Sequence, residues 1–168
     1  GNIEGIPEPE IHESNGVANI MLTGIGGTGV LAISAIIGMA AHLQNKDSSI
    51  LDMTGLAQKG GAVWSHIKVY EKGVLPFSHK ISPASADLLL ACDAVVATKP
   101  EIQEVISDEK TKSIINTNTI PVADFVTDRN LDFRSDHVVK VIEKTTQSIE
   151  SELPAIKIAE HLTGDAIG

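Results

Sequence analysis

The sequence predicts an α/β fold of three layers, in which a mostly parallel sheet lies between helices and also contains an antiparallel hairpin. Segments with strand and helix patterns alternate along the chain, and this alternation is typical of a parallel sheet with helices on both faces. The apolar residues are largely Ile, Val, Leu and Ala, and only 3% of all residues are aromatic. At 168 residues, the chain is long enough for one compact domain.

The first part of the domain is predicted to begin with a strand, a glycine turn and a helix. The helix is apolar nearly all round, so we expect it to be covered on most sides. Further along, apolar and polar residues alternate over 62–70, and the turn at 71–73 predicts a hairpin. The elements predicted here are strand 17–23, helix 28–44, strand 48–53, strand 62–70 and its hairpin partner 74–78.

The second part continues the alternation of strands and helices. Ser82 followed by Pro83 predicts a helix start, Asp136 predicts a helix cap, and Gly164 predicts a helix end. The elements predicted here are helix 84–91, strand 94–98, helix 100–106, strand 112–117, helix 138–144 and helix 154–162.

Charge and cysteine content exclude several classes of function. The formal net charge is −9, so a basic nucleic-acid surface is not expected. Four of these charges come from glutamates in residues 1–16, which we interpret as an acidic linker or tail before the domain at 17–168. The sole cysteine, Cys92, excludes an internal disulfide, a four-thiolate zinc site and an iron–sulfur cluster held by this chain alone.

A run of 32 positions between Glu13 and Lys46 contains no Asp, Glu, Lys or Arg and resembles a membrane span. Its glycines divide it into a strand-like piece and a helical piece, each shorter than the ~20 residues that a spanning helix needs. The acidic N-terminus does not resemble a signal peptide, so we predict a cytoplasmic protein with no membrane partner. The apolar, turn-like residues 162–168 suggest a piece of a longer protein.

The strongest local motif is GxGxxG, which lies between a predicted strand and helix. It comprises Gly24, Gly26 and Gly29, with Gly27 and Thr28 between them, and Asp52 lies 28 residues after Gly24. In dinucleotide-binding folds such glycines let the backbone approach a phosphate, and the acidic residue binds a ribose hydroxyl. The alternative is a purely structural turn, and the hairpin that follows disfavours a standard dehydrogenase.

The loop at residues 54–61 is a second candidate site. It leaves a strand end and carries Gln58 and Lys59 among glycines, so Lys59 could bind a carboxylate or phosphate, or it could be an ordinary solvated lysine. The six histidines show no ligand spacing, and no metal site is predicted. Cys92 reads as a small core residue, and no catalytic residue can be assigned.

Five sequence strings are specific when taken together, namely GIGGTGV at 24–30, LDMTGLAQKGGAV at 51–63, SHI at 65–67, ADLLLACDAVVA at 86–97 and NTNTIP at 116–121. Together they resemble the gamma-type domain of 2-oxoacid:ferredoxin oxidoreductases, and in particular the indolepyruvate type. The resemblance spans roughly residues 17–125 and implies a Rossmann-like domain.

The resemblance implies a part of an enzyme that oxidatively decarboxylates a 2-oxoacid, forms an acyl-coenzyme A and reduces ferredoxin. In that family, thiamine diphosphate and the iron–sulfur clusters lie on other domains or subunits, which would be the partners of this chain in an oligomer. By analogy, Gly26, Gly27, Thr28, Gly29, Gln58 and Lys59 would contact coenzyme A phosphates or the neighbouring catalytic domain. The isolated domain would be inactive.

Two alternatives remain open at the level of sequence. One is a free-standing NAD(P)-binding dehydrogenase that uses the glycine motif and Asp52, although no acid–base residue for hydride transfer is identifiable. The other is a module that only mediates assembly and binds no small molecule.

Overall fold

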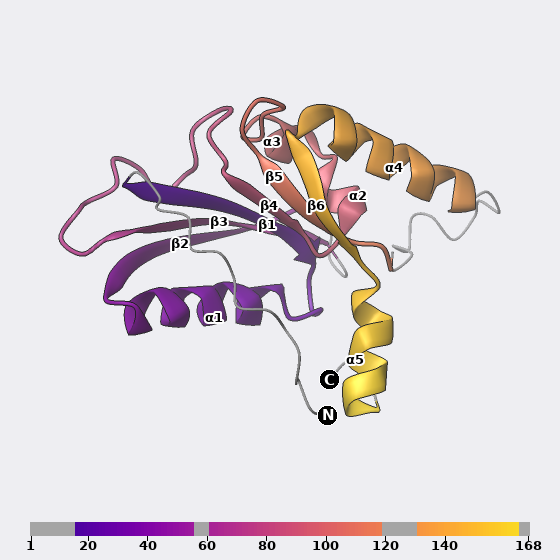
Figure 1. The fold of residues 1–168 in the computed structure, drawn as a ribbon, viewed down its shortest axis with the longest axis horizontal. Coiled ribbons are helices and arrows are strands. Elements are labelled where there is room, and N and C mark those ends of the chain that lie inside the picture. The colour runs from indigo at the N-terminus through magenta and orange to yellow at the C-terminus, as the bar shows by residue number, and fades with distance from the viewer. Residues whose placement is uncertain (1–15, 56–60, 119–130, 165–168) are drawn as a thin grey trace.

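A computed structural model describes residues 16–55, 61–118 and 131–164, without the side chains of residues 131–136. Six strands form one sheet in the order β2-β3-β1-β4-β5-β6 (Figure 1). The strands are β1 (Val17–Ile25), β2 (Lys46–Thr54), β3 (Ala62–Glu71), β4 (Leu88–Ala91), β5 (Lys112–Asn116) and β6 (Ser148–Leu153). The helices are α1 (Val30–Leu43), α2 (Ala94–Ala97), α3 (Pro100–Gln103), α4 (Leu131–Thr145) and α5 (Ala155–Thr163).

The predicted mostly parallel sheet with an antiparallel element is confirmed, but the predicted hairpin partner is wrong. Strand β3 pairs antiparallel with both β2 and β1, whereas β1–β4, β4–β5 and β5–β6 are parallel pairs. Residues 74–78 form no strand. Two nine-residue registers already occupy both edges of β3, and Pro76 has no N–H to offer a ladder.

The predictions for residues 84–91 and 94–98 are also wrong, because strand and helix are exchanged there. Residues 88–91 form the central strand β4, and residues 94–97 form helix α2. Short apolar runs carry no period that separates a buried strand from a buried helix. Asp93 decides the second case, since its carboxylate accepts a hydrogen bond from the Val96 N–H at 2.8 Å and caps α2.

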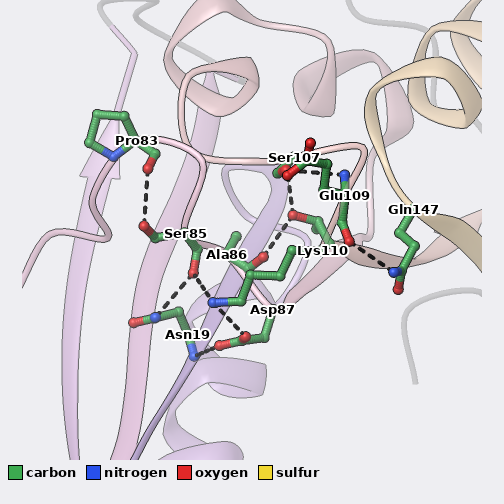
Figure 2. A network of polar contacts seen from close by, with 10 residues as sticks. Asn19, Pro83, Ser85, Ala86, Asp87, Ser107, Glu109, Lys110 and Gln147 are labelled. Carbon is green, nitrogen blue, oxygen red and sulfur yellow. Dashed lines mark hydrogen bonds and ion pairs between the residues drawn. The ribbon is translucent and has the colours of Figure 1, made fainter.

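Polar contacts hold the segment that leads into β4 in an extended path (Figure 2). The backbone N–H of Asn19 donates to the Asp87 carboxylate at 2.7 Å, and the Asn19 side chain donates to the Ser85 carbonyl at 3.1 Å. Lys110 pairs with Asp87 at 2.9 Å. Ala84 has a φ of 50°, in the left-handed region, so a helix cannot run through it from Pro83.

The observed bounds of α3, α4 and β6 also differ from the predicted ones. Helix α4 starts at Leu131, so Asp136 lies inside it rather than at its cap, and strand β6 was not predicted. Helix α3 ends at Gln103, earlier than predicted. Strand β5 and helix α5 agree with the sequence, and Gly164 ends α5 with a φ of 77°.

The two faces of the sheet carry different layers. Helix α1 covers one face alone, over a core cluster of Leu22, Val30, Val63 and Ile67. Helices α2, α3 and α4 cover the other face, over a larger cluster (Figure 1). The sequence predicts that α1 is covered on most sides. Within this chain it is covered on the sheet side only, because no described element lies beyond its outer face. Its outer face exposes large apolar side chains, namely Leu31, Ile36, Met39 and Leu43.

Within the described residues, no helix combines the length and the apolar character required to cross a membrane.

Candidate functional site

The topology has a switch point at the carboxyl ends of β1 and β4. These two strands are neighbours and run parallel. The chain leaves β1 into α1 on one face of the sheet and leaves β4 into α2 and α3 on the other. In open α/β sheets, ligands bind at such a switch point. The predicted glycine motif lies there.

The glycine turn has the backbone geometry that its sequence predicts. Gly27 and Gly29 both have a φ of 85°, and Gly29 is the N-cap residue of α1. A Cβ on Gly24 would lie 2.2 Å from Cγ2 of Val30, so only glycine lets the strand and helix pack this closely. The turn thus needs glycine for structural reasons as well.

The turn also presents backbone donors to solvent. Residues 26–29 are exposed. The N–H of Thr28 donates to the Ile25 carbonyl at 3.2 Å, and its hydroxyl donates to the same oxygen at 2.6 Å. In the described part of the chain, no acceptor is found for the N–H groups of Gly27 and Gly29. Together with the N-terminus of α1, these donors favour a bound anion.

The turn after β4, at Cys92 and Asp93, lies on the other side of this switch point. Thr23 joins it to β1, because its hydroxyl donates to the Asp93 carbonyl at 3.1 Å while the Asp93 N–H donates to the Thr23 carbonyl at 3.2 Å. Asn116, at the end of β5, donates to the Cys92 carbonyl at 3.0 Å. Its side-chain oxygen accepts from the N–H of Ala155 at 3.1 Å. Asn116 therefore ties three strand ends together, a role that its sequence context did not reveal.

Two titratable groups, Cys92 and Asp93, lie in this turn, and both have raised pKa values. Burial raises the pKa of the Cys92 thiol, and the neighbouring Asp93 carboxylate raises it further. Burial also raises the pKa of Asp93, against the opposing effect of the N–H groups of Val96 and Val95. A thiol with a raised pKa is a poor nucleophile at neutral pH. At this switch point, the groups suited to an anion are the backbone N–H donors of the glycine turn.

Asp52 lies apart from the glycine turn. Strand β3 runs between β1, which carries the turn, and β2, which carries Asp52. Two strand spacings separate them by about 10 Å. The Asp52 carboxylate accepts a hydrogen bond from the Ser65 hydroxyl on β3. This is not the arrangement of a dinucleotide site, in which the strand with the acidic residue lies beside the first strand.

Gln58 and Lys59 lie outside the described residues, as does most of the predicted tail at 1–16. The two ends of their loop are described. The Gly26 N–H donates to the Gly61 carbonyl at 2.9 Å, and the Gly55 N–H donates to the Ala62 carbonyl at 2.7 Å. The loop at 56–60 therefore leaves and rejoins the fold beside the glycine turn. Among the described residues, no cluster of three metal-ligating side chains exists.

Comparison with known families shows which family the chain belongs to. The sequence model of the family described as pyruvate ferredoxin/flavodoxin oxidoreductase matches residues 19–167. The chain belongs to this family. The resemblance that the sequence strings indicated is therefore confirmed over nearly the whole domain.

A curated relative and two solved structures are similar to this member of the family. Indolepyruvate oxidoreductase subunit IorB of Methanothermobacter thermautotrophicus is 28% identical over 141 residues, which cover 83% of this chain and 64% of the relative. The chain thus spans less than two thirds of that relative's length.

The structural neighbours agree on the α/β fold. Pyruvate oxidoreductase subunit PORC of Thermotoga maritima matches with a TM-score of 0.57 and 18% identity, over 91% of this chain and 70% of that one. The 2-oxoglutarate:ferredoxin oxidoreductase of Magnetococcus marinus, with 2-oxoglutarate, coenzyme A and succinyl-CoA bound, matches with a TM-score of 0.59 and 12% identity. That match covers 91% of this chain and 22% of that one, so the fold is a small part of a longer chain there.

Proposed function

We propose that this chain is a subunit or domain of a 2-oxoacid:ferredoxin oxidoreductase of the indolepyruvate type. The enzyme would oxidatively decarboxylate an arylpyruvate, transfer the acyl group to coenzyme A and reduce ferredoxin. The family match over residues 19–167 carries the proposal, and the relative named as an indolepyruvate oxidoreductase subunit supports the substrate class.

In this proposal, the cofactors of the enzyme lie on partner domains or subunits and not on this chain. Thiamine diphosphate would supply the decarboxylation chemistry from a partner domain, and iron–sulfur clusters on partner domains would carry the electrons to ferredoxin. A single cysteine cannot ligate a four-thiolate cluster. Cys92 has a raised pKa, which makes its thiol a poor nucleophile at neutral pH.

The glycine turn would bind a phosphate group of coenzyme A. The turn fits this group because residues 26–29 are exposed and a Cβ on Gly27 or Gly29 would meet no described atom within 4 Å. The N–H groups of Gly27 and Gly29, for which no described residue supplies an acceptor, and the N-terminus of α1 favour an anion. Lys59 would add a positive charge from the loop beside the turn. The Magnetococcus enzyme with coenzyme A bound supports this ligand.

The partner subunit would cover the outer face of α1. This face exposes Ile36 by 67% and Leu43 by 79%, and α1 contains no Asp, Glu, Lys or Arg. A continuous apolar surface of this kind marks an interaction site. A module that only mediates assembly would also expose it, so ligand binding has to be tested separately.

Reconstitution tests the proposed reaction. The chain is co-expressed with the thiamine- and cluster-bearing parts of its enzyme, and indolepyruvate-dependent reduction of ferredoxin is followed with and without coenzyme A. We expect activity from the complex and none from this chain alone. Turnover by the purified chain, or a complex that ignores coenzyme A, would contradict the proposal.

Titration with coenzyme A separates the ligand-binding module from the assembly module. In the assembled complex, Lys59→Ala is expected to weaken coenzyme A binding by about tenfold, the effect of losing roughly one charged phosphate contact. Lys140→Ala, on the exposed side of α4, is the matched control and should change nothing. Binding that Lys59→Ala leaves intact would remove this loop from the site. A stabilising shift with NAD instead of coenzyme A would favour the dehydrogenase alternative.

A further inference from the structure

A cavity lies on the face of the sheet opposite α1, away from the glycine turn, and the proposed function does not use it. Its volume is about 280 Å³. Met53 of β2 and Trp64 and His66 of β3 line it, together with Lys80 and the two glutamates Glu101 and Glu104. Ligand pockets for drug-sized molecules are about 300–1,000 Å³, so this cavity suits a smaller molecule.

His66 gives the cavity a fixed hydrogen-bond donor. The ring is 2% exposed, and its Nδ1 accepts a hydrogen bond from the Ile81 N–H at 3.2 Å. Burial lowers the pKa of His66 to about 4, and the charges of Lys80 and Lys68 add to this effect. The ring is therefore neutral at pH 7 and carries its proton on Nε2.

That donor has no partner within the described protein. No described residue accepts from Nε2 of His66, and the same is true of the indole N–H of Trp64, which is 6% exposed. Both nitrogens keep some contact with solvent. Among the described residues, the side-chain polar atoms that are inaccessible to solvent and also lack a hydrogen-bond partner are the amide oxygens of Asn19 and Asn118. An unpaired donor on a buried side chain is costly unless a ligand or water satisfies it.

The residues that line the cavity include both a positive and two negative side chains. Lys80 supplies a cation near His66, as its effect on the histidine pKa indicates. Glu101 of α3 and Glu104 at its end supply two carboxylates. Met53 and Trp64 add apolar lining to the same cavity. A simple anion would meet two glutamates, and a simple cation would leave the His66 N–H unpaired.

We propose that this cavity binds a free α-amino acid with an apolar side chain. Its carboxylate accepts from Nε2 of His66 and pairs with Lys80, its ammonium group pairs with Glu101 or Glu104, and its side chain packs on Trp64. The inference goes beyond the proposed oxidoreductase function, because it concerns a separate site and is tested by binding alone.

Three matched probes test it by calorimetry on the full chain. L-phenylalanine carries both charges, 3-phenylpropanoate lacks the ammonium group, and phenethylamine lacks the carboxylate. We expect L-phenylalanine to bind with millimolar affinity or better and each truncated probe to bind at least about tenfold more weakly. Absence of binding by L-phenylalanine at about 10 mM, or equal binding of all three probes, would overturn the proposal.

Two exposed substitutions assign the ends of the ligand. Lys80→Met is expected to weaken L-phenylalanine and 3-phenylpropanoate but not phenethylamine, and Glu104→Gln is expected to weaken the two amines but not the acid. Lys140→Met on α4 serves as a control for an exposed lysine outside the cavity. If both cavity variants bind L-phenylalanine as tightly as the unchanged chain, the ligand lies elsewhere and the proposal is wrong.

Discussion

The two faces of the sheet differ in how completely this chain covers them. On the side of α2, α3 and α4, one core cluster extends from Met21 on β1 to Ile142 on α4, and both are fully buried. On the other side, α1 buries a smaller cluster and exposes apolar side chains outward. A face that is complete within the chain contributes stability, whereas a face that ends in exposed apolar residues needs a further layer. Substitutions in the complete face should therefore change stability, whereas substitutions on the outer face of α1 should change assembly.

The largest effect is expected in the complete face. Leu89, in the central strand β4, is fully buried, so Leu89→Ala should lower the free energy of unfolding by about 2–5 kcal/mol. Leu31→Ala on α1 removes the same atoms from a side chain that is 56% exposed, and should cost less than about 1 kcal/mol. Urea unfolding of both variants measures the difference. Equal losses would mean that the two faces do not differ as the burial indicates.

A smaller effect is expected where α1 meets β1. Gly24→Ala places a methyl group 2.2 Å from Cγ2 of Val30, so the helix must shift, at a cost of about 1–3 kcal/mol. Gly26→Ala, two residues away, meets nothing nearer than 3.5 Å and should cost less than about 1 kcal/mol. Combining Gly24→Ala with Val30→Ala should recover part of the loss if the clash is its cause. Thermal unfolding of the three variants decides this.

His66 should make the complete face sensitive to acid. Its pKa is lowered to about 4 in the folded chain, against an ordinary value of 6.5, so the unfolded chain binds more protons between these limits. The contribution of His66 is therefore fully present above about pH 6.5 and is lost as the pH falls toward 4, by about 3 kcal/mol. His66→Gln should remove this slope, and His42→Gln on exposed α1 should keep it. Parallel pH profiles for both variants and the unchanged chain would contradict the assignment.

The sequence predicted those parts of the fold whose signals are local. The strand, glycine turn and helix at residues 17–44 were found because glycine spacing and apolar length are read from neighbouring residues. Residues 88–91 and 94–97 were exchanged because a short apolar run becomes a strand only by its place between β1 and β5. Strand β6 was missed because Glu150 and Glu152 give it the polar character of an edge.

The candidate site divides in the same way. The glycine turn was located correctly, since the motif that predicts it lies within residues 24–29. The role of Asn116 and the cavity at His66 could not be predicted, because both depend on contacts between residues far apart in sequence, such as Ile81 with His66. Asp52 was paired with the glycine turn on the assumption of adjacent strands, and β3 separates them.

The smallest effect on stability is expected on the outer face of α1, where the largest effect on assembly should occur. Ile36 is 67% exposed, so Ile36→Lys should change the free energy of unfolding of the isolated chain by no more than about 0.5 kcal/mol. In the complex, the same lysine would place an unpaired charge in an apolar interface, which is strongly unfavourable.

A matched variant keeps this prediction specific to α1. Leu75→Lys introduces the same charge at a side chain that is 90% exposed, in the segment between β3 and β4. Size-exclusion chromatography of the co-expressed subunits should show loss of the complex with Ile36→Lys and retention of it with Leu75→Lys. Retention with both would mean that the partner does not cover α1, and loss with both would mean that added positive charge, and not the α1 face, disrupts assembly.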